Sequence, residues 1–145
     1  MNKELTIILT EDDLGHATLI KRNLKRAGLL NDIIHFTDGQ QVLDFLEAEK
    51  KKKTLLPALL LLDIKMPKVD GIEVLKTVKG DPSLKKMPVI MITTTDDPRE
   101  IERCHELGCS NYIKKPIDYD KFVDAIRKLG LFLLVVEMPH IGSNP

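Results

Sequence analysis

The sequence has few cysteines, no excess of charge of either sign and no long apolar run. Each absence excludes a class of protein. The 145 residues include two cysteines, Cys104 and Cys109, which are too few and too close together for a disulfide framework. We therefore expect reduced thiols in a cytoplasmic protein. Lysine plus arginine and aspartate plus glutamate number 22 each, so a zero net charge gives no general attraction to nucleic acid or acidic lipid.

Membrane-spanning and secretory segments are also missing. No stretch is apolar over the ~20 residues that a membrane-crossing helix requires, and the apolar run near the N-terminus is too short for a signal peptide. The sequence shows no repeat, no low-complexity linker and no internal domain boundary. With 43% hydrophobic and 30% charged residues, it is typical of a soluble chain with one core. We expect one domain over residues 1–130 and a C-terminal extension over 131–145.

Five short apolar runs alternate with five stretches of helical periodicity. We expect strands at residues 5–9, 32–36, 58–62, 88–94 and 110–115, and helices at residues 13–28, 38–49, 71–81, 97–108 and 118–130. Asp13 is placed to cap the first helix and Gly28 to end it. Asp97 precedes a proline at the start of the fourth helix, where proline is favoured. The third strand, Ala-Leu-Leu-Leu-Leu, lacks polar alternation, so both of its faces should be buried.

This order of elements predicts the fold class. Strands that alternate with helices pair in parallel through right-handed crossovers, and strands without polar alternation need helices on both faces. We therefore predict an α/β fold, a doubly wound five-stranded parallel sheet of the flavodoxin-like kind, followed by an apolar extension. In such sheets, sites form at the carboxyl ends of the strands. The residues that end the strands should therefore converge, although they lie far apart in the sequence.

Polar residues follow or end four of the predicted strands. They are Glu11, Asp12 and Asp13 after the first, Asp63 after the third, Thr93 and Thr94 at the end of the fourth, and Lys115 before Pro116 at the end of the fifth. Each alone is ordinary for a turn, but together they would place carboxylates, a hydroxyl and an ammonium at one rim. We therefore interpret Asp63, which follows four leucines, as a positioned reactive group rather than a surface residue.

The chemistry of this set favours phosphoryl transfer with a divalent cation. Clustered carboxylates repel one another and raise one pKa unless a cation lies among them. An open set of oxygen ligands suits Mg²⁺, which keeps several waters and often binds a phosphate. A carboxylate can attack phosphorus and form an aspartyl phosphate. Lys115 would then hold one phosphoryl oxygen, and a strand-end threonine would donate a hydrogen bond to another.

These segments resemble the receiver domains of two-component response regulators. The resemblance covers about residues 4–130, with EDD at 11–13, LLLLDIKMPKVDG at 59–71, PVIMITT at 88–94 and NYIKKP at 111–116 in the order and approximate spacing of the family. It implies a protein that accepts a phosphoryl group from a sensor histidine kinase and signals through changed protein–protein contacts. It also implies no enzyme activity beyond weak self-phosphorylation and self-dephosphorylation.

The same resemblance implies roles for individual residues. Asp63 would be the phosphoacceptor, Lys115 the phosphate-binding lysine, Thr93 the switch hydroxyl and Tyr112 the rotating aromatic residue. Mg²⁺, for which Mn²⁺ can substitute, would be bound by Asp63, Asp12, Glu11 through water, and the backbone carbonyl of Lys65. Without this context, Tyr112 would be interpreted as an ordinary half-buried strand residue.

One subgroup of the family is more similar than the rest. FTDGQQVLDFL at 36–46, KGDPSLKKMPV at 79–89 and LGLFLLVVEMP at 129–139 resemble the stand-alone response regulators paired with bacterial phytochromes. The implied partner is a red-light-sensing histidine kinase, and many members dimerise through the fourth and fifth helices. The apolar run at 131–138 requires a cover, either its own domain or a second copy, and we favour a homodimer.

Three other functions compete with the signalling receiver. A phosphohydrolase of the haloacid-dehalogenase type would need a second acid two residues after its nucleophile, where this chain has Lys65. A receiver that works without phosphorylation would lack an acid, Asp63 or Lys115, yet all are present. A flavodoxin-like cofactor site would need a hydroxyl- and glycine-rich loop after the first strand, where EDDLGH would repel phosphate unless a metal were bound.

Several remaining polar residues have ordinary interpretations. The four histidines, at positions 16, 35, 105 and 140, lie at no ligand spacing and are interpreted as surface or interface residues. Thr95 and Asp96 are expected to cap the fourth helix. The lysines at 50–53 are expected to form a solvated helix end near its negative pole.

Overall fold

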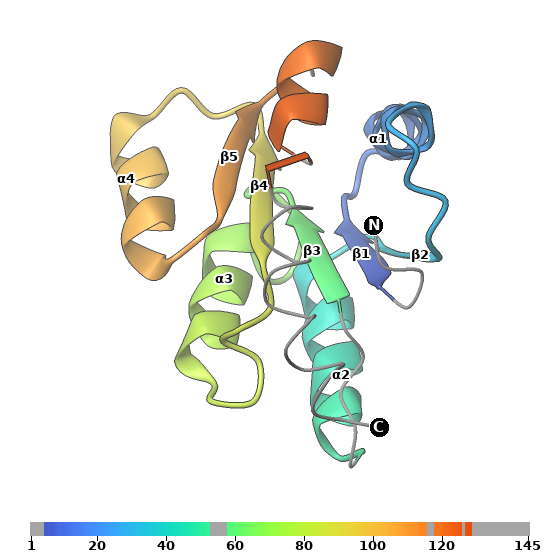
Figure 1. Cartoon of the computed structure of the whole chain (residues 1–145). Coiled ribbons are helices and arrows are strands. Elements are labelled where there is room, and N and C mark those ends of the chain that lie inside the picture. Colours follow the sequence, from blue (N-terminus) through green and yellow to red (C-terminus); the bar gives the residue numbers. More distant parts are fainter. Residues whose placement is uncertain (1–4, 53–57, 116–117, 126, 129–145) are drawn as a thin grey trace.

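The fold is described by a computed structural model that covers residues 5–52, 58–115, 118–125 and 127–128 (Figure 1). Its strands are β1 (Thr6–Thr10), β2 (Ile33–Phe36), β3 (Ala58–Leu62), β4 (Val89–Thr93) and β5 (Asn111–Lys114). Its helices are α1 (Leu14–Arg26), α2 (Gly39–Lys50), α3 (Gly71–Gly80) and α4 (Pro98–Leu107), and residues 119–125 form a further helix. The predicted alternation of strands and helices is confirmed.

The five strands form one parallel sheet in the order β2-β1-β3-β4-β5. The chain starts in β1, moves to one side for β2 and then crosses to the other side for β3. The strand order therefore reverses between β1 and β3. Thr10 is paired with Leu62 across these two strands, and the N–H of Asp63 donates to the Thr10 carbonyl at 3.2 Å. Glu11 and Asp63 thus leave the sheet side by side at the switch point.

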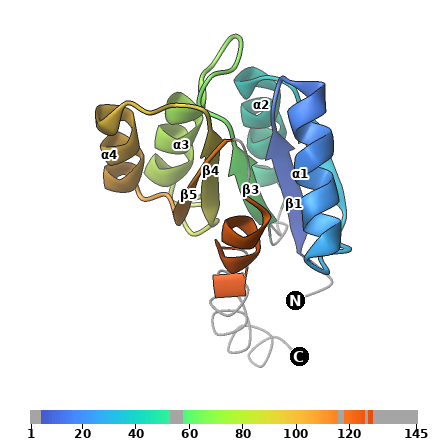
Figure 2. The same cartoon turned by 90° about the horizontal axis from the view of Figure 1, so that it is seen from above.

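Helices cover both faces of the sheet (Figure 2), which confirms the doubly wound α/β prediction. Leu59 and Leu61 pack with α1 and with Phe122 of the helix at 119–125. Leu60 and Leu62 point the other way and pack with α2, α3 and α4. Every residue of β3 is buried, so the absence of polar alternation reflects a strand enclosed on both faces.

Aspartate begins each helix of known bounds. Asp13, Asp38, Asp70 and Asp97 are the N-caps of α1 to α4, and each carboxylate accepts a backbone N–H of the first turn. The predicted cap Asp13 and the proline after Asp97 are confirmed. The expectation that Thr95 and Asp96 cap α4 is wrong, because Asp97 takes that place. The Thr95 hydroxyl instead accepts the Asp97 N–H and donates to Glu100.

Glycine ends two of these helices. Gly28 follows α1 with φ of 88°, and Gly108 follows α4 with φ of 98°, a left-handed backbone that glycine adopts without strain. The end of the last helix and the apolar run at 131–138 lie outside the described residues. Within the part of the chain that the structure describes, no helix has the length and apolar character needed to cross a membrane.

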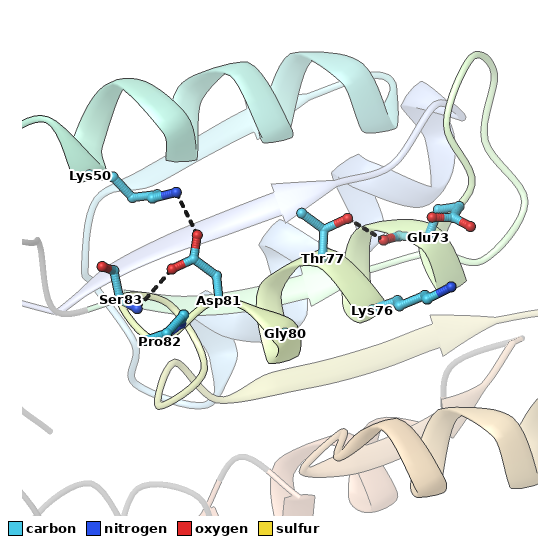
Figure 3. Close-up of a pocket in the computed structure, with 8 residues that line it drawn as sticks. All are labelled: Lys50, Glu73, Lys76, Thr77, Gly80, Asp81, Pro82 and Ser83. Atoms are coloured by element: carbon cyan, nitrogen blue, oxygen red, sulfur yellow. Dashed lines mark hydrogen bonds and ion pairs between the residues drawn. The ribbon is translucent and has the colours of Figure 1, made fainter.

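Lysines at the end of α2 form ion pairs at the sheet edge opposite to the carboxyl ends of the strands. Lys50 Nζ lies 2.6 Å from Asp81 Oδ2, just after the end of α3 (Figure 3). Lys52 Nζ lies 3.1 Å from Glu49 Oε1. Lys53 lies outside the described residues. Lys51 and Lys52 are exposed, as expected for a solvated helix end, whereas Lys50 is half-buried and links α2 to the segment after α3. A shallow pocket at this place is lined by both acids and lysines, so it selects neither sign of charge.

Candidate functional site

Three carboxylates converge at the carboxyl ends of β1 and β3, as predicted. Glu11, Asp12 and Asp63 each offer an oxygen atom, and these atoms lie within 4.8 Å of one another. Glu11 and Asp63 are buried, whereas Asp12 is exposed. The register of β1 and β3 fixes this meeting, because the two strands end opposite each other and the next residue of each carries an acid.

The ammonium of Lys115 lies among these carboxylates. Its Nζ donates to Asp63 Oδ2 at 3.2 Å and also donates to Glu11 Oε1. The side chain is buried, and its backbone N–H donates to the Thr93 carbonyl at 2.7 Å, which continues the pairing of β5 with β4 beyond the strand end. Residues 11, 63 and 115, predicted to share one rim, are therefore in direct contact.

Burial and repulsion both act against negative charge at Glu11. Burial raises the pKa of the Glu11 carboxyl, hydrogen bonds from Lys115 and from the Asp13 N–H lower it, and the nearby Asp63 charge raises it again, with a net upward shift. The single positive charge of Lys115 therefore does not neutralise the negative charge of the three carboxylates. A divalent cation would offset the remaining charge, and a set of carboxylate oxygens suits Mg²⁺, Mn²⁺ or Ca²⁺ better than softer metals. The donor set fits the predicted metal.

Thr93 and Tyr112 are connected through one intervening residue. Thr93 is fully buried at the end of β4, and its hydroxyl accepts the Thr95 N–H at 3.4 Å. The Tyr112 hydroxyl donates to the Thr95 carbonyl at 3.2 Å, and burial raises the pKa of Tyr112 to about 12. The chain of contacts leads from the rim to β5 and to the start of α4. The switch roles of Thr93 and Tyr112 remain predictions.

The loop after Asp63 turns sharply against the backbone of that residue. A Cβ atom at Gly71 would lie 2.0 Å from the Asp63 carbonyl oxygen, so only glycine fits there. The Gly71 N–H donates to the Ile64 carbonyl at 2.7 Å and closes the loop. Lys65 is exposed within it, two residues after the acid. The metal-binding role of its carbonyl remains a prediction.

Two histidines lie at the rim without having been predicted as site residues. His16 Nδ1 is 2.9 Å from Lys115 Nζ, and His35 Nε2 is 2.9 Å from the Glu11 carbonyl, to which it must donate because a carbonyl only accepts. Their interpretation as surface residues missed these contacts. The signals were present: His16 lies in the first turn of the helix after the acids, and His35 is next to last in the strand beside β1.

Comparisons with known proteins agree with this geometry. The response regulator receiver domain family matches residues 7–127. The chain is 32% identical over 128 residues to the probable methanogenesis regulatory protein FilR2 of Methanothrix harundinacea, covering 88% of this chain and 83% of that protein. It is also 32% identical over 115 residues to the response regulator Rcp1 of Synechocystis, covering 79% and 78% respectively.

Solved structures give the same result. A response regulator receiver domain from Rhodospirillum rubrum is 48% identical with a TM-score of 0.73, covering 90% of this chain and 94% of that one. The bacteriophytochrome response regulator RtBRR is 38% identical with a TM-score of 0.77, covering 90% and 79%. Phosphorylated cyanobacterial RcpA and Mn²⁺-bound Rcp1 are both 29% identical with TM-scores of 0.73, covering 89% of this chain and 93% and 94% of theirs.

Proposed function

Because this chain belongs to the response regulator receiver family, we propose that Asp63 is the residue that accepts the phosphoryl group from a sensor histidine kinase. One observation carries the assignment. Asp63 and Glu11 both lie in the carboxylate cluster and contact the Lys115 ammonium at the point where the strand order reverses. Both Glu11 oxygens accept hydrogen bonds, from Lys115 and from the Asp13 N–H, and Asp63 is the more accessible of the two acids, at 7% exposed against 1%. Negative charge can therefore be delivered to this side chain against a positive counter-charge.

The transfer is an exchange of bonds at phosphorus. An Asp63 carboxylate oxygen forms the new O–P bond while the P–N bond to the donor imidazole breaks. The departing ring nitrogen keeps the bonding electron pair, and with its other nitrogen protonated the donor leaves as a neutral imidazole. Lys115 donates to one phosphoryl oxygen as charge gathers there, and the Thr93 hydroxyl donates to another. Positioning and electrostatics supply most of the catalysis.

A divalent cation is the proposed cofactor, with Mg²⁺ as the ion and Mn²⁺ as a substitute. Asp12 and Asp63 would bind it through carboxylate oxygens, Glu11 through a water, and Lys65 through its backbone carbonyl. When bound, the ion neutralises phosphoryl oxygens and orients them for transfer. The support is the chemistry of the donor set and the raised pKa of Glu11, which an added positive charge would bring down.

The proposed output is a change in protein–protein contacts. Phosphorylation would bias Thr93 and Tyr112 between two arrangements and thereby reshape the surface of α4 and β5. We further propose a bacterial phytochrome kinase as the partner, supported by the similarity to RtBRR and Rcp1. Residues 1–130 would form the receiver and 131–145 a segment that stabilises a homodimer in the cytoplasm. Beyond self-phosphorylation and slow self-dephosphorylation, no turnover is proposed.

The assignment is tested by incubating the protein with a small acyl phosphate and Mg²⁺ and measuring intact mass. One phosphoryl group should be gained by the native protein and none by Asp63→Asn. Asp44→Asn, an identical exchange on the exposed side of α2, is the matched control and should be phosphorylated normally. A phosphoryl group on Asp63→Asn, or none on the native protein, would contradict the proposal.

Partner and assembly need separate experiments. A panel of purified histidine kinases, with and without phytochrome modules, should phosphorylate the chain fastest when the kinase is a phytochrome. Light scattering after size-exclusion chromatography should give a dimer for the full chain and a monomer for a chain cut after residue 130. Equal rates across the panel would remove the phytochrome proposal, and monomers from both chains would remove the dimer.

A further inference from the structure

The Lys115 ammonium has three acceptors, and one of them is neutral. An ammonium carries three N–H donors and no acceptor. Here they are directed to Asp63 Oδ2, to Glu11 Oε1 and, at 2.9 Å, to His16 Nδ1 on the first turn of α1. Two acceptors are carboxylates of the phosphoryl-transfer site. The third is the imidazole of His16, which is not part of the carboxylate cluster.

A carboxylate lies on the other side of the His16 ring. Because an ammonium can only donate, Nδ1 must carry its lone pair, and the ring proton must be on Nε2. Nε2 lies 3.8 Å from Asp13 Oδ2, and the other oxygen of that carboxylate accepts the His16 backbone N–H at 3.0 Å. The carboxylate that caps α1 therefore lies near the ring nitrogen that carries the proton when Nδ1 accepts from Lys115.

A neutral acceptor has a specific advantage at this position. When a phosphoryl group is transferred, Asp63 gives one oxygen to the new bond, and Glu11 would help to hold a divalent cation. Both charged partners of Lys115 are therefore needed elsewhere. His16 can keep its hydrogen bond throughout, and it adds no negative charge to a site that must receive more.

We propose that His16 is a positioning residue for phosphoryl transfer, which aims the Lys115 ammonium at the incoming phosphoryl group through a hydrogen bond to Nδ1. The inference rests on the function proposed above and adds a residue to it. Lysine has four rotatable side-chain bonds, so an ammonium that loses a fixed acceptor must be reoriented in each transfer. His16 removes that freedom, although its own side chain is 45% exposed.

The kinetic test compares two replacements of His16. His16→Leu removes the acceptor and should lower the rate of Asp63 phosphorylation by acyl phosphate about tenfold, the size expected from losing a hydrogen bond to a charged group. His16→Asn can place an amide oxygen near the position of Nδ1 and should recover most of the rate. Thr18→Leu puts a leucine at an exposed site on the same helix and should react as the native protein does.

A spectroscopic test does not depend on phosphorylation. Side-chain ¹⁵N NMR of the metal-free protein, at a pH where the ring is neutral, should show His16 with its proton on Nε2 and a hydrogen-bonded Nδ1. Lys115→Met should remove the hydrogen-bond shift of Nδ1. A proton on Nδ1, or an Nδ1 chemical shift unchanged by Lys115→Met, would overturn the inference.

The failures of the two proposals are distinguishable. If the native protein gains no phosphoryl group on Asp63, the proposed function fails. If the native protein is phosphorylated and His16→Leu reacts equally fast, only the role of His16 fails. The same holds if His16→Asn is as slow as His16→Leu, because the acceptor would then not be the feature that matters.

Discussion

Single residues at the rim are arranged at a cost to stability. Burying an ionised carboxylate or ammonium costs several kcal/mol even after relaxation, and Glu11, Asp63 and Lys115 are all buried here. Their ion pairs recover part of this cost, but the carboxylates outnumber the ammonium. Sites that violate the rules of stable packing in this way are expected where chemistry is carried out. This cost is expected at a site whose carboxylates and ammonium are placed to bind a cation and a phosphoryl group.

Lys65 should determine how long a phosphoryl group remains on Asp63. Its exposed side chain starts two residues after the acid and can reach over the phosphoryl group, where it would hinder an attacking water. Lys65→Ala should therefore raise the rate of spontaneous dephosphorylation about threefold, a change in barrier below ~1 kcal/mol. The rate is followed by intact mass after the donor is removed. Lys76→Ala, an exposed lysine on α3, should leave it unchanged, and an unchanged or lower rate for Lys65→Ala would refute the expectation.

Tyr112 should titrate well above an ordinary tyrosine. Burial raises its pKa to about 12 because the fold favours the neutral phenol, which donates to the Thr95 carbonyl. The contribution to stability is complete below the unfolded pKa of about 10 and is lost as pH rises toward the folded value. In Tyr119→Phe, where Tyr112 is the one tyrosine left, tyrosinate absorbance should show this high midpoint. A midpoint equal to that of the denatured chain would disprove it.

The two ends of α3 should respond oppositely to the same substitution. Gly71→Ala would place a Cβ 2.0 Å from the Asp63 carbonyl oxygen, so the loop that carries Asp63 must shift, and we expect a loss above ~2 kcal/mol in the free energy of unfolding. Gly80→Ala meets nothing within 4 Å at the other end of the helix and should stabilise the protein by about 0.5 kcal/mol. Urea denaturation measures both changes. Equal effects would show that the steric argument is wrong.

The elements of this fold were predictable to different degrees. β3 is a continuous apolar run and β4 is apolar up to Thr93, and each is buried throughout, so both strands can be located from their runs of apolar residues. Aspartate marks the helix starts for a different reason. Its carboxylate accepts hydrogen bonds from the N–H groups that the first turn of every helix leaves free. The caps of α4 were assigned wrongly because Thr95, Asp96 and Asp97 all have suitable side chains. Asp97 is the cap because it directly precedes Pro98 in the first turn and its carboxylate accepts the Arg99 N–H, whereas Asp96 pairs with Lys114 of β5.

At the scale of the whole molecule, the sequence predicted that the strand-end residues lie close together, but it did not predict which other side chains contact them. Parallel strands place their carboxyl ends at one edge, so the meeting of Glu11, Asp63 and Lys115 follows from topology. The positions of His16 and His35 do not follow from it. They depend on how α1 leaves the sheet and on the register of β2 against β1, which side-chain packing decides. The rule that sites form at the carboxyl ends of parallel strands therefore locates the central residues of the site more readily than surrounding residues such as His16 and His35.

A divalent cation should stabilise the whole fold through this one rim. An ion that binds only the folded state raises the free energy of unfolding by about 2.7 kcal/mol at a hundred times its dissociation constant, and thermal unfolding with and without Mg²⁺ measures the gain. Asp12→Asn removes the exposed carboxylate of the cluster, so it should lose most of the gain. Asp44→Asn should keep it. If both variants gain equally, the ion acts elsewhere, because only a site built from Glu11, Asp12 and Asp63 makes the response depend on Asp12.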